Sequence, residues 1–242
     1  MPTPLLRGPL LLLLYQVVPA PPARVEPDSL GRYRLTVGLG SGRWENEVFG
    51  CNGELVSATG VSYGSGGAQL DAWPTPHLRV TPFGGTFRPT PDSASSDVKD
   101  YRGPFGGGQL AFEGQHFGLG VGAARISGYD GFWAPSTYVR IGNMDGGYFR
   151  ADVFPPAPVL GSTGWARAGV GFREGHRRGV GGFFGVALPP AYSQKAMVTG
   201  SLHFPVAGRL AVRLDGIFGP GESISQQGAA VALRYDFGSS RR

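Results

Sequence analysis

The residues able to carry out catalytic or metal chemistry are few and scattered in this sequence. The histidines lack the spacing of metal ligands, and a single cysteine, Cys51, excludes a cysteine-based metal cluster. Ser201 and His203 share one strand face, where a nucleophile and its base rarely come within hydrogen-bond reach, so a packed or solvated histidine is the better interpretation. We therefore predict no enzymatic activity, no catalytic residues, no metal site and no cofactor. The histidines are His77, His116, His176 and His203.

Arginines and aspartates near the end of the chain offer a second kind of chemistry, the formation of ion pairs. In the stretch AAVALRYDF, residues 229–237, Arg234 and Asp236 alternate with apolar and aromatic residues, and Arg213 and Asp215 repeat this spacing. Facing side chains on neighbouring strands lie about 5 Å apart, and enclosed charges are costly unless they are paired. We therefore predict a charge network of Arg32, Arg34, Arg209, Arg213, Asp215, Arg234 and Asp236.

This network is expected to form two groups within a basic interior. Asp236 is expected to contact Arg209, Arg32 and Arg34, and Asp215 to contact Arg213 and Arg234. Across all predicted inward positions, nine basic residues face four acidic ones, an excess that would favour anions. The basic residues are Arg32, Arg34, Arg140, Arg150, Arg167, Lys195, Arg209, Arg213 and Arg234, and the acidic ones are Glu113, Asp152, Asp215 and Asp236.

Such pairing requires strands, and an alternation of apolar and polar residues predicts them from Gly31 onward. The 42 glycines interrupt almost every window in which an amphipathic helix could form, while 12% aromatic residues argue against a disordered chain. We expect about twelve antiparallel strands, with ten or eight as alternatives, because the candidates between Gly42 and Phe87 are weak. The net charge of +5 is spread along the chain, so no nucleic-acid partner is predicted.

The first 30 residues have a different composition from the rest. One basic residue, Arg7, precedes an apolar run from Pro9 to Val18 and then small residues and prolines, a layout typical of a secretory signal peptide. The run is too short to span a membrane as a helix. We predict a signal peptide at residues 1–23, a linker at 24–30, one β-domain at 31–237 and a tail at 238–242.

Connection lengths favour a membrane barrel over a soluble β-sandwich. Short turns such as PVA and NMDG alternate with longer loops, as in membrane barrels; GSGGAQLDAWPTP, read as a loop, is an exception. The non-apolar faces are rich in glycine, alanine and serine, as a narrow interior requires. Aromatic residues, among them Phe154, Trp133 and Phe218, fall at strand ends, where membrane barrels carry aromatic girdles. We therefore expect an all-β, transmembrane, up-and-down antiparallel barrel with apolar faces outward.

The terminal strand carries a resemblance to a known family. Val231, Leu233, Tyr235 and Phe237 alternate along VALRYDF and end in an aromatic residue, which resembles the C-terminal strand of bacterial outer-membrane β-barrels; here GSSRR follows it. The resemblance implies recognition of this strand by the barrel-assembly machinery, insertion into outer-membrane lipid and location in the outer membrane of a Gram-negative bacterium.

Three functions are compatible with these patterns. The first is a non-enzymatic outer-membrane barrel with a charged, largely filled lumen and a structural or surface-interaction role. The second is a narrow pore that prefers anions and passes small solutes. The third is a secreted soluble β-sandwich that binds a ligand, in which the apolar faces would be buried together. The sequence identifies neither a solute nor a surface ligand.

Overall fold

The computed structural model of the protein contains strands and no helices among the residues that it describes, which are 33–49, 51–52, 54–92, 102–127, 132–157, 159, 166–173, 179–188, 196–219 and 226–238. Within these ranges no helix is long and apolar enough to cross a membrane. The predicted signal peptide, the linker, Arg32, Lys195 and the tail beyond Gly238 lie outside the described residues. The strands are β1 (Tyr33–Phe49), β2 (Leu55–Thr75), β3 (Leu78–Pro91), β4 (Gly103–Glu113), β5 (Phe117–Ile126), β6 (Phe132–Pro135), β7 (Thr137–Gly142), β8 (Gly147–Val153), β9 (Ala166–Phe172), β10 (Gly181–Leu188), β11 (Met197–Ala207), β12 (Leu210–Gly219) and β13 (Gln226–Phe237).

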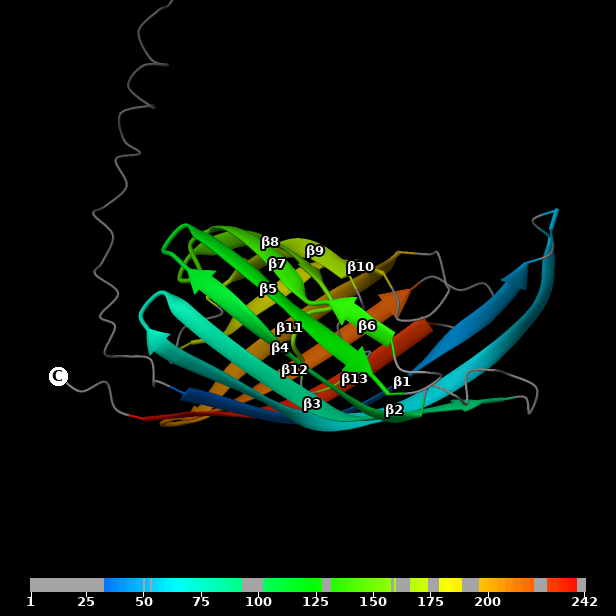
Figure 1. Cartoon of the computed structure of the whole chain (residues 1–242), viewed down its shortest axis with the longest axis horizontal. Helices are drawn as coiled ribbons and strands as arrows, with labels where there is room; N and C mark the ends of the chain where they lie inside the picture. The colour runs from blue at the N-terminus through cyan, green and yellow to red at the C-terminus, as the bar shows by residue number, and fades with distance from the viewer. Residues whose placement is uncertain are drawn as a thin grey trace, which may run out of the picture.

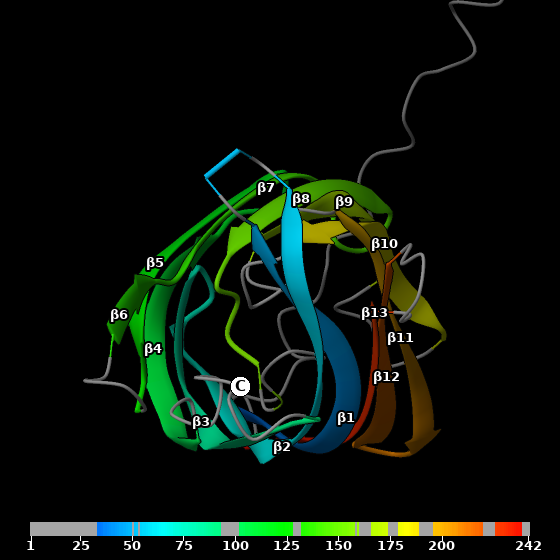
Figure 2. The ribbon, with the colours of Figure 1, turned by 90° about the vertical axis from the view of Figure 1, so that its right-hand side faces the viewer.

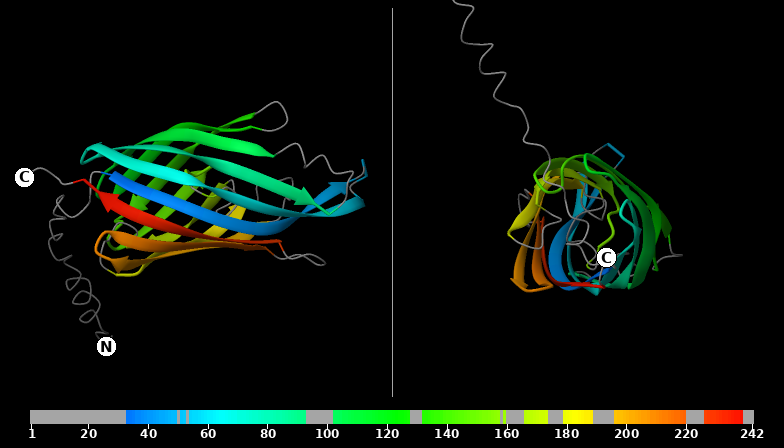
Figure 3. Two further views of the ribbon diagram at one scale, coloured as in Figure 1. Left: turned by 90° about the horizontal axis from the view of Figure 1, so that it is seen from below. Right: turned by 90° about the vertical axis from the view of Figure 1, so that its left-hand side faces the viewer.

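Twelve of these strands form a closed antiparallel barrel of up-and-down topology, which confirms the predicted fold class (Figure 1). β13 pairs with β12 on one side and with β1 on the other, in a continuous register from Tyr33 opposite Phe237 to Arg43 opposite Gln227. Figure 3 shows β1 and β13 side by side where the barrel closes. The short β6 is the additional strand: it pairs with the end of β5 while β7 pairs with its beginning, and the buried Ser136 separates them.

The two faces of the wall are oriented as predicted. Val198, Leu214 and Leu233 are about half exposed on the outside of the barrel. Arg234, the residue after Leu233, is buried inside it. A β-sandwich would bury the apolar faces against each other, so the soluble-sandwich alternative is wrong. The side-chain period of two therefore places the apolar stripe outside the barrel and the charged stripe inside it.

Most connections at one end of the barrel are short turns and most at the other end are longer loops, with one correction to the prediction. Residues 64–75, predicted as a loop, belong to β2, which turns into β3 through residues 76–77. The long alternation of small residues, interrupted by glycines, hid this strand. With these residues in β2, the connection to β3 is a short turn, while β1 and β2 project as a long hairpin beyond the opposite, long-loop end (Figure 1).

The barrel interior divides into an apolar part and a charged part. Toward the long-loop end, inward side chains of β2 to β5 form an apolar cluster that includes Tyr63, Phe83, Phe87 and Phe105. Phe154, predicted at the outer rim of the barrel, instead packs into this cluster with a positive φ of 45°. The left-handed backbone at Phe154 turns the chain into the barrel rather than outward, so that prediction is wrong. The charged part lies nearer the short turns.

Candidate functional site

The candidate site is the charged interior of the barrel. Among the described inward-facing strand positions, seven arginines and five carboxylates are buried or partly buried. They come from β1, β2, β3, β4, β7, β8, β9, β12 and β13, so the charges surround the lumen. The arginines are Arg34, Arg79, Arg140, Arg150, Arg167, Arg213 and Arg234, and the carboxylates are Asp71, Glu113, Asp152, Asp215 and Asp236.

Asp152 is the most enclosed carboxylate, and it binds two arginines. Arg150 donates to it through Nε at 2.8 and 3.0 Å and approaches Oδ1 with Nη2 at 2.7 Å, and the Nε of Arg167 lies 2.9 Å from Oδ2. Each guanidinium also lies over an aromatic ring, Arg150 over Tyr138 at 4.4 Å and Arg167 over Phe183 at 4.7 Å. Cation–π contact and ion pairing together fix both side chains across β8 and β9.

Arg79 on β3 contacts two further carboxylates, one on each neighbouring strand of the inner face. It lies 3.6 Å from Asp71 and 3.1 Å from Glu113, and Arg140 approaches Glu113 at 3.5 Å. Asp71 also accepts hydrogen bonds from Gln69 at 3.0 Å and from Thr81 at 2.8 Å. These charges therefore have the partners that burial in a protein interior requires.

Sequence reasoning missed Asp71 and Arg79, although both belong to the site. Asp71 fell in the segment read as a loop, and proline and glycine obscured the strand that carries Arg79. The signal that would have found Asp71 is the alternation Gln69, Asp71, Trp73, which continues the inward face of β2.

The structure brings together only part of the predicted Asp236 cluster. The Nε of Arg34 lies 2.9 Å from Asp236, and Arg234 lies 3.8 Å from the same carboxylate. Arg209, predicted as a partner, is exposed in the turn between β11 and β12, and only its backbone carbonyl accepts a hydrogen bond from the Asp236 amide. That prediction is wrong because β12 begins at Leu210, after Gly208 has turned the chain with a φ of 51°.

The predicted contact between Arg213 and Asp215 is present within β12. Arg213 donates to Asp215 through Nε at 2.9 Å and Nη2 at 2.7 Å. Residues two apart on a strand share a face, so spacing alone could identify this pair. It differs from the cross-strand contacts, whose partners depend on register.

Replacing Asp236 by alanine should lower the free energy of unfolding by about 2 kcal/mol, because Arg34 and Arg234 would lose a shared carboxylate. Urea unfolding of the barrel in detergent measures this change. An unfolding midpoint equal to that of the unaltered protein would show that the cluster does not stabilise the fold.

The interior is also occupied by the chain that follows β8. Figure 2 shows this segment descending inside the barrel, and Phe154, Ala157 and Val159 are buried there. Val159 packs on Gly38 and Gly40 of β1, where an added Cβ would approach its methyl groups to 2.9 and 2.7 Å. Glycine at these positions therefore makes room for the inserted segment.

Replacing Gly40 by valine should lower stability by roughly 1–3 kcal/mol, because the new side chain overlaps Val159 and Ala230. Gly64, on the outer face of β2, has no heavy atom within 4 Å of an added Cβ, so Gly64→Val is the matched control and should be close to neutral. Thermal unfolding of both variants tests the difference. Equal effects would contradict the seating of Val159 on Gly40.

The terminal strand presents its apolar residues outward. Val231, Leu233 and Tyr235 are about half exposed, and Phe237 stacks on Tyr33 of β1 with ring centroids 5.3 Å apart. Because this contact joins the last strand to the first, it contributes to closure of the barrel.

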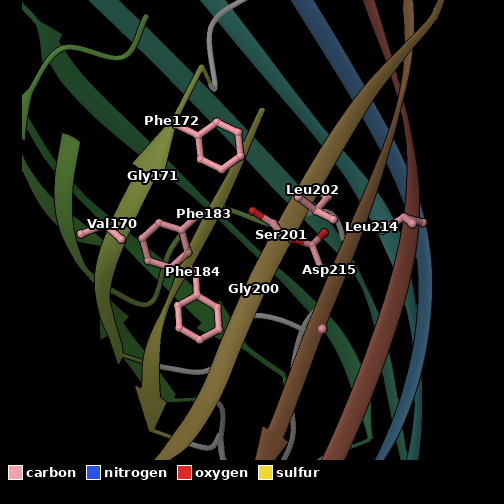
Figure 4. Close-up of a pocket in the computed structure, with 11 residues that line it drawn as sticks. Val170, Gly171, Phe172, Phe183, Phe184, Gly200, Ser201, Leu202, Leu214 and Asp215 are labelled. Carbon is pink, nitrogen blue, oxygen red and sulfur yellow. The ribbon is translucent and has the colours of Figure 1, made fainter. Parts of the chain in front are cut away.

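The remaining candidates for chemistry are a histidine and a hollow in the outer wall. His203 and Ser201 are buried on the inward face of β11, opposite Arg213 and Asp215. Within the described part of the chain, no group of three or more potential metal ligands occurs. Over β9 to β12, a hollow of about 720 Å³ is lined mainly by apolar residues such as Phe184, Leu202 and Leu214 (Figure 4). Ser201 and Asp215 also line this hollow.

Comparison with known proteins adds no relative: no family model matches the chain, and no curated protein sequence matches it.

Proposed function

We propose that the protein is a transmembrane β-barrel of a bacterial outer membrane, with a structural or surface-interaction role and no enzymatic activity. The observation that carries this proposal is the outer wall, on which large apolar side chains are exposed around the barrel. Leu39, for example, is 70% exposed, and residues on β5, β10 and β13 repeat the pattern. Contiguous apolar surface of this extent is rare on soluble proteins, and it is what lipid requires of a barrel wall.

The placement of aromatic residues supports a lipid environment. Tyr33, Phe117 and Phe172 are exposed near the short-turn end, and Trp133 and Phe218 are exposed nearer the long-loop end. Membrane barrels carry such aromatic girdles at both interfaces. In this orientation β13 would be the strand that barrel-assembly machinery recognises, after export directed by the N-terminal segment.

The filled interior supports a structural role over open conduction. Buried ion pairs line the lumen, and Phe154, Ala157 and Val159 are buried inside the barrel, where Val159 packs against β1. The hairpin of β1 and β2 extends beyond the wall (Figure 1) and offers a surface for a partner outside the membrane.

Membrane fractionation combined with heat-modifiable migration on SDS gels tests the proposal. We expect the protein in the outer-membrane fraction and a faster-migrating band in unboiled samples, because a closed barrel resists SDS until it is heated. A soluble protein with no migration shift would overturn the membrane assignment.

A narrow anion-preferring pore is the second candidate, favoured by the excess of seven arginines over five carboxylates among the described inward positions. Single-channel recording in planar bilayers distinguishes it from the structural role. Conductance with anion preference would support the pore, whereas a silent bilayer would support the filled barrel.

A further inference from the structure

Six arginines are among the described residues that line a small cavity in the barrel interior. Its volume is about 70 Å³, and its neutral polar neighbours include Thr36, Gln69, Ser201 and His203. Asp71 is the one carboxylate among the described residues that line it. The arginines come from six strands and are Arg34, Arg79, Arg150, Arg167, Arg213 and Arg234.

Within the described part of the chain, the carboxylates that contact these arginines are fewer than the arginines. Asp152 is shared by Arg150 and Arg167, and Asp236 is shared by Arg34 and Arg234. Seven arginines and five carboxylates on the described inward strand positions leave two positive charges in excess. Excess charge enclosed by a protein is costly, so a bound anion would stabilise this arrangement.

We propose that the cavity binds a small inorganic oxyanion with the size and charge of sulfate or phosphate. The planar guanidinium group matches tetrahedral oxyanions through paired N–H donors. Arg34 and Arg167 each donate to a carboxylate through Nε. The Nε side of each guanidinium group therefore faces the carboxylate, and its terminal nitrogens can donate to a ligand. A volume of about 70 Å³ holds several waters or one small anion.

The inference deepens the pore candidate by naming an anion class, but it needs no conduction. The cavity lies inside the barrel whichever solvent surrounds the outer wall. If the protein inserts into membranes but binds no oxyanion, only the proposed anion site is wrong. If the protein is soluble and binds sulfate, only the proposed membrane location is wrong.

The first experiment follows thermal unfolding of the full chain in detergent while sodium sulfate or phosphate replaces sodium chloride at constant ionic strength. We expect a saturable rise in the unfolding midpoint, of roughly 5–10 °C at a hundredfold excess over the dissociation constant. Sulfate also stabilises proteins non-specifically by exclusion from their surface. That effect does not saturate, so a rise that is linear in concentration would contradict the site.

The decisive variant removes the charge excess without isolating a carboxylate. In Arg167→Gln/Arg234→Gln, Asp152 keeps Arg150 and Asp236 keeps Arg34, so the described inward positions carry five charges of each sign. We expect at least tenfold weaker oxyanion binding and loss of the saturable rise. Arg88→Gln/Arg125→Gln is the matched control, because both of these arginines are exposed, and it should respond as the unaltered protein does.

Calorimetric titration of the unaltered protein with sulfate gives a measurement that does not depend on the variants folding. Binding of one anion per barrel supports the site, and absence of binding overturns it. An unchanged saturable rise in Arg167→Gln/Arg234→Gln would also overturn it, because the arginines that share carboxylates would then not be the ones that bind the anion.

Discussion

Asp152→Asn should lower the free energy of unfolding by about 3–5 kcal/mol, the largest effect that we expect from a single substitution in the charged interior. The Asp152 side chain is 0% exposed and contacts both Arg150 and Arg167. Asparagine keeps the size of the side chain but removes its charge, so two enclosed guanidinium groups lose their counter-ion. Urea titration of the folded barrel, followed by tryptophan fluorescence, measures the change.

A surface ion pair supplies the control for this prediction. Asp92 pairs with Arg43, and their side chains are 48% and 38% exposed. Because water screens such a pair, Asp92→Asn should change the unfolding free energy by only about 0–1 kcal/mol. If the two substitutions had the same effect, burial of Asp152 would not be the cause of its contribution.

Val231→Arg should cost about 2–4 kcal/mol if the outer wall faces hydrocarbon, because a charge near the bilayer midplane loses its hydration. Val231 lies in the middle of β13, is 49% exposed and faces Leu39 and Leu214 on the neighbouring strands. The same substitution on a wall that faces water would change stability by only about 0.5 kcal/mol. Unfolding of the protein from lipid vesicles makes the measurement.

Val231→Ala separates the effect of charge from the loss of side-chain volume. It removes apolar contact but adds no charge, so most of the stability should be retained. A Val231→Arg protein as stable as Val231→Ala in vesicles would contradict a hydrocarbon environment for the outer wall, and with it the proposed function.

The contact of Arg34 with Asp236 across the barrel closure was predicted, but most other cross-strand partners of the interior charges could not be derived from spacing in the sequence. The partners of Asp236 depend on where β12 begins, and a turn shorter by one residue would move Arg209 from the turn into the strand. The contact of Arg79 with Asp71 could be predicted only if residues 64–75 were recognised as part of β2. Register is a property of paired strands, and a one-residue shift turns every side chain to the opposite face.

The sequence by itself determined the fold class, an approximate number of barrel strands and the outward or inward face of most recognised strand residues. A period of two is a local property, so Leu233 and Arg234 take opposite sides of the wall whatever their neighbours are. The pair of Arg213 and Asp215, two residues apart, is local for the same reason.

The tertiary structure alone decided what occupies the interior. Asp152 holds Arg150 and Arg167 because β8 and β9 pair in one particular register. Val159 reaches Gly40 because the left-handed turn at Phe154 sends the chain into a lumen that exists only after closure. Both arrangements depend on distances between different segments of the chain. These distances are fixed by strand pairing and by closure of the barrel, and local sequence patterns do not specify them.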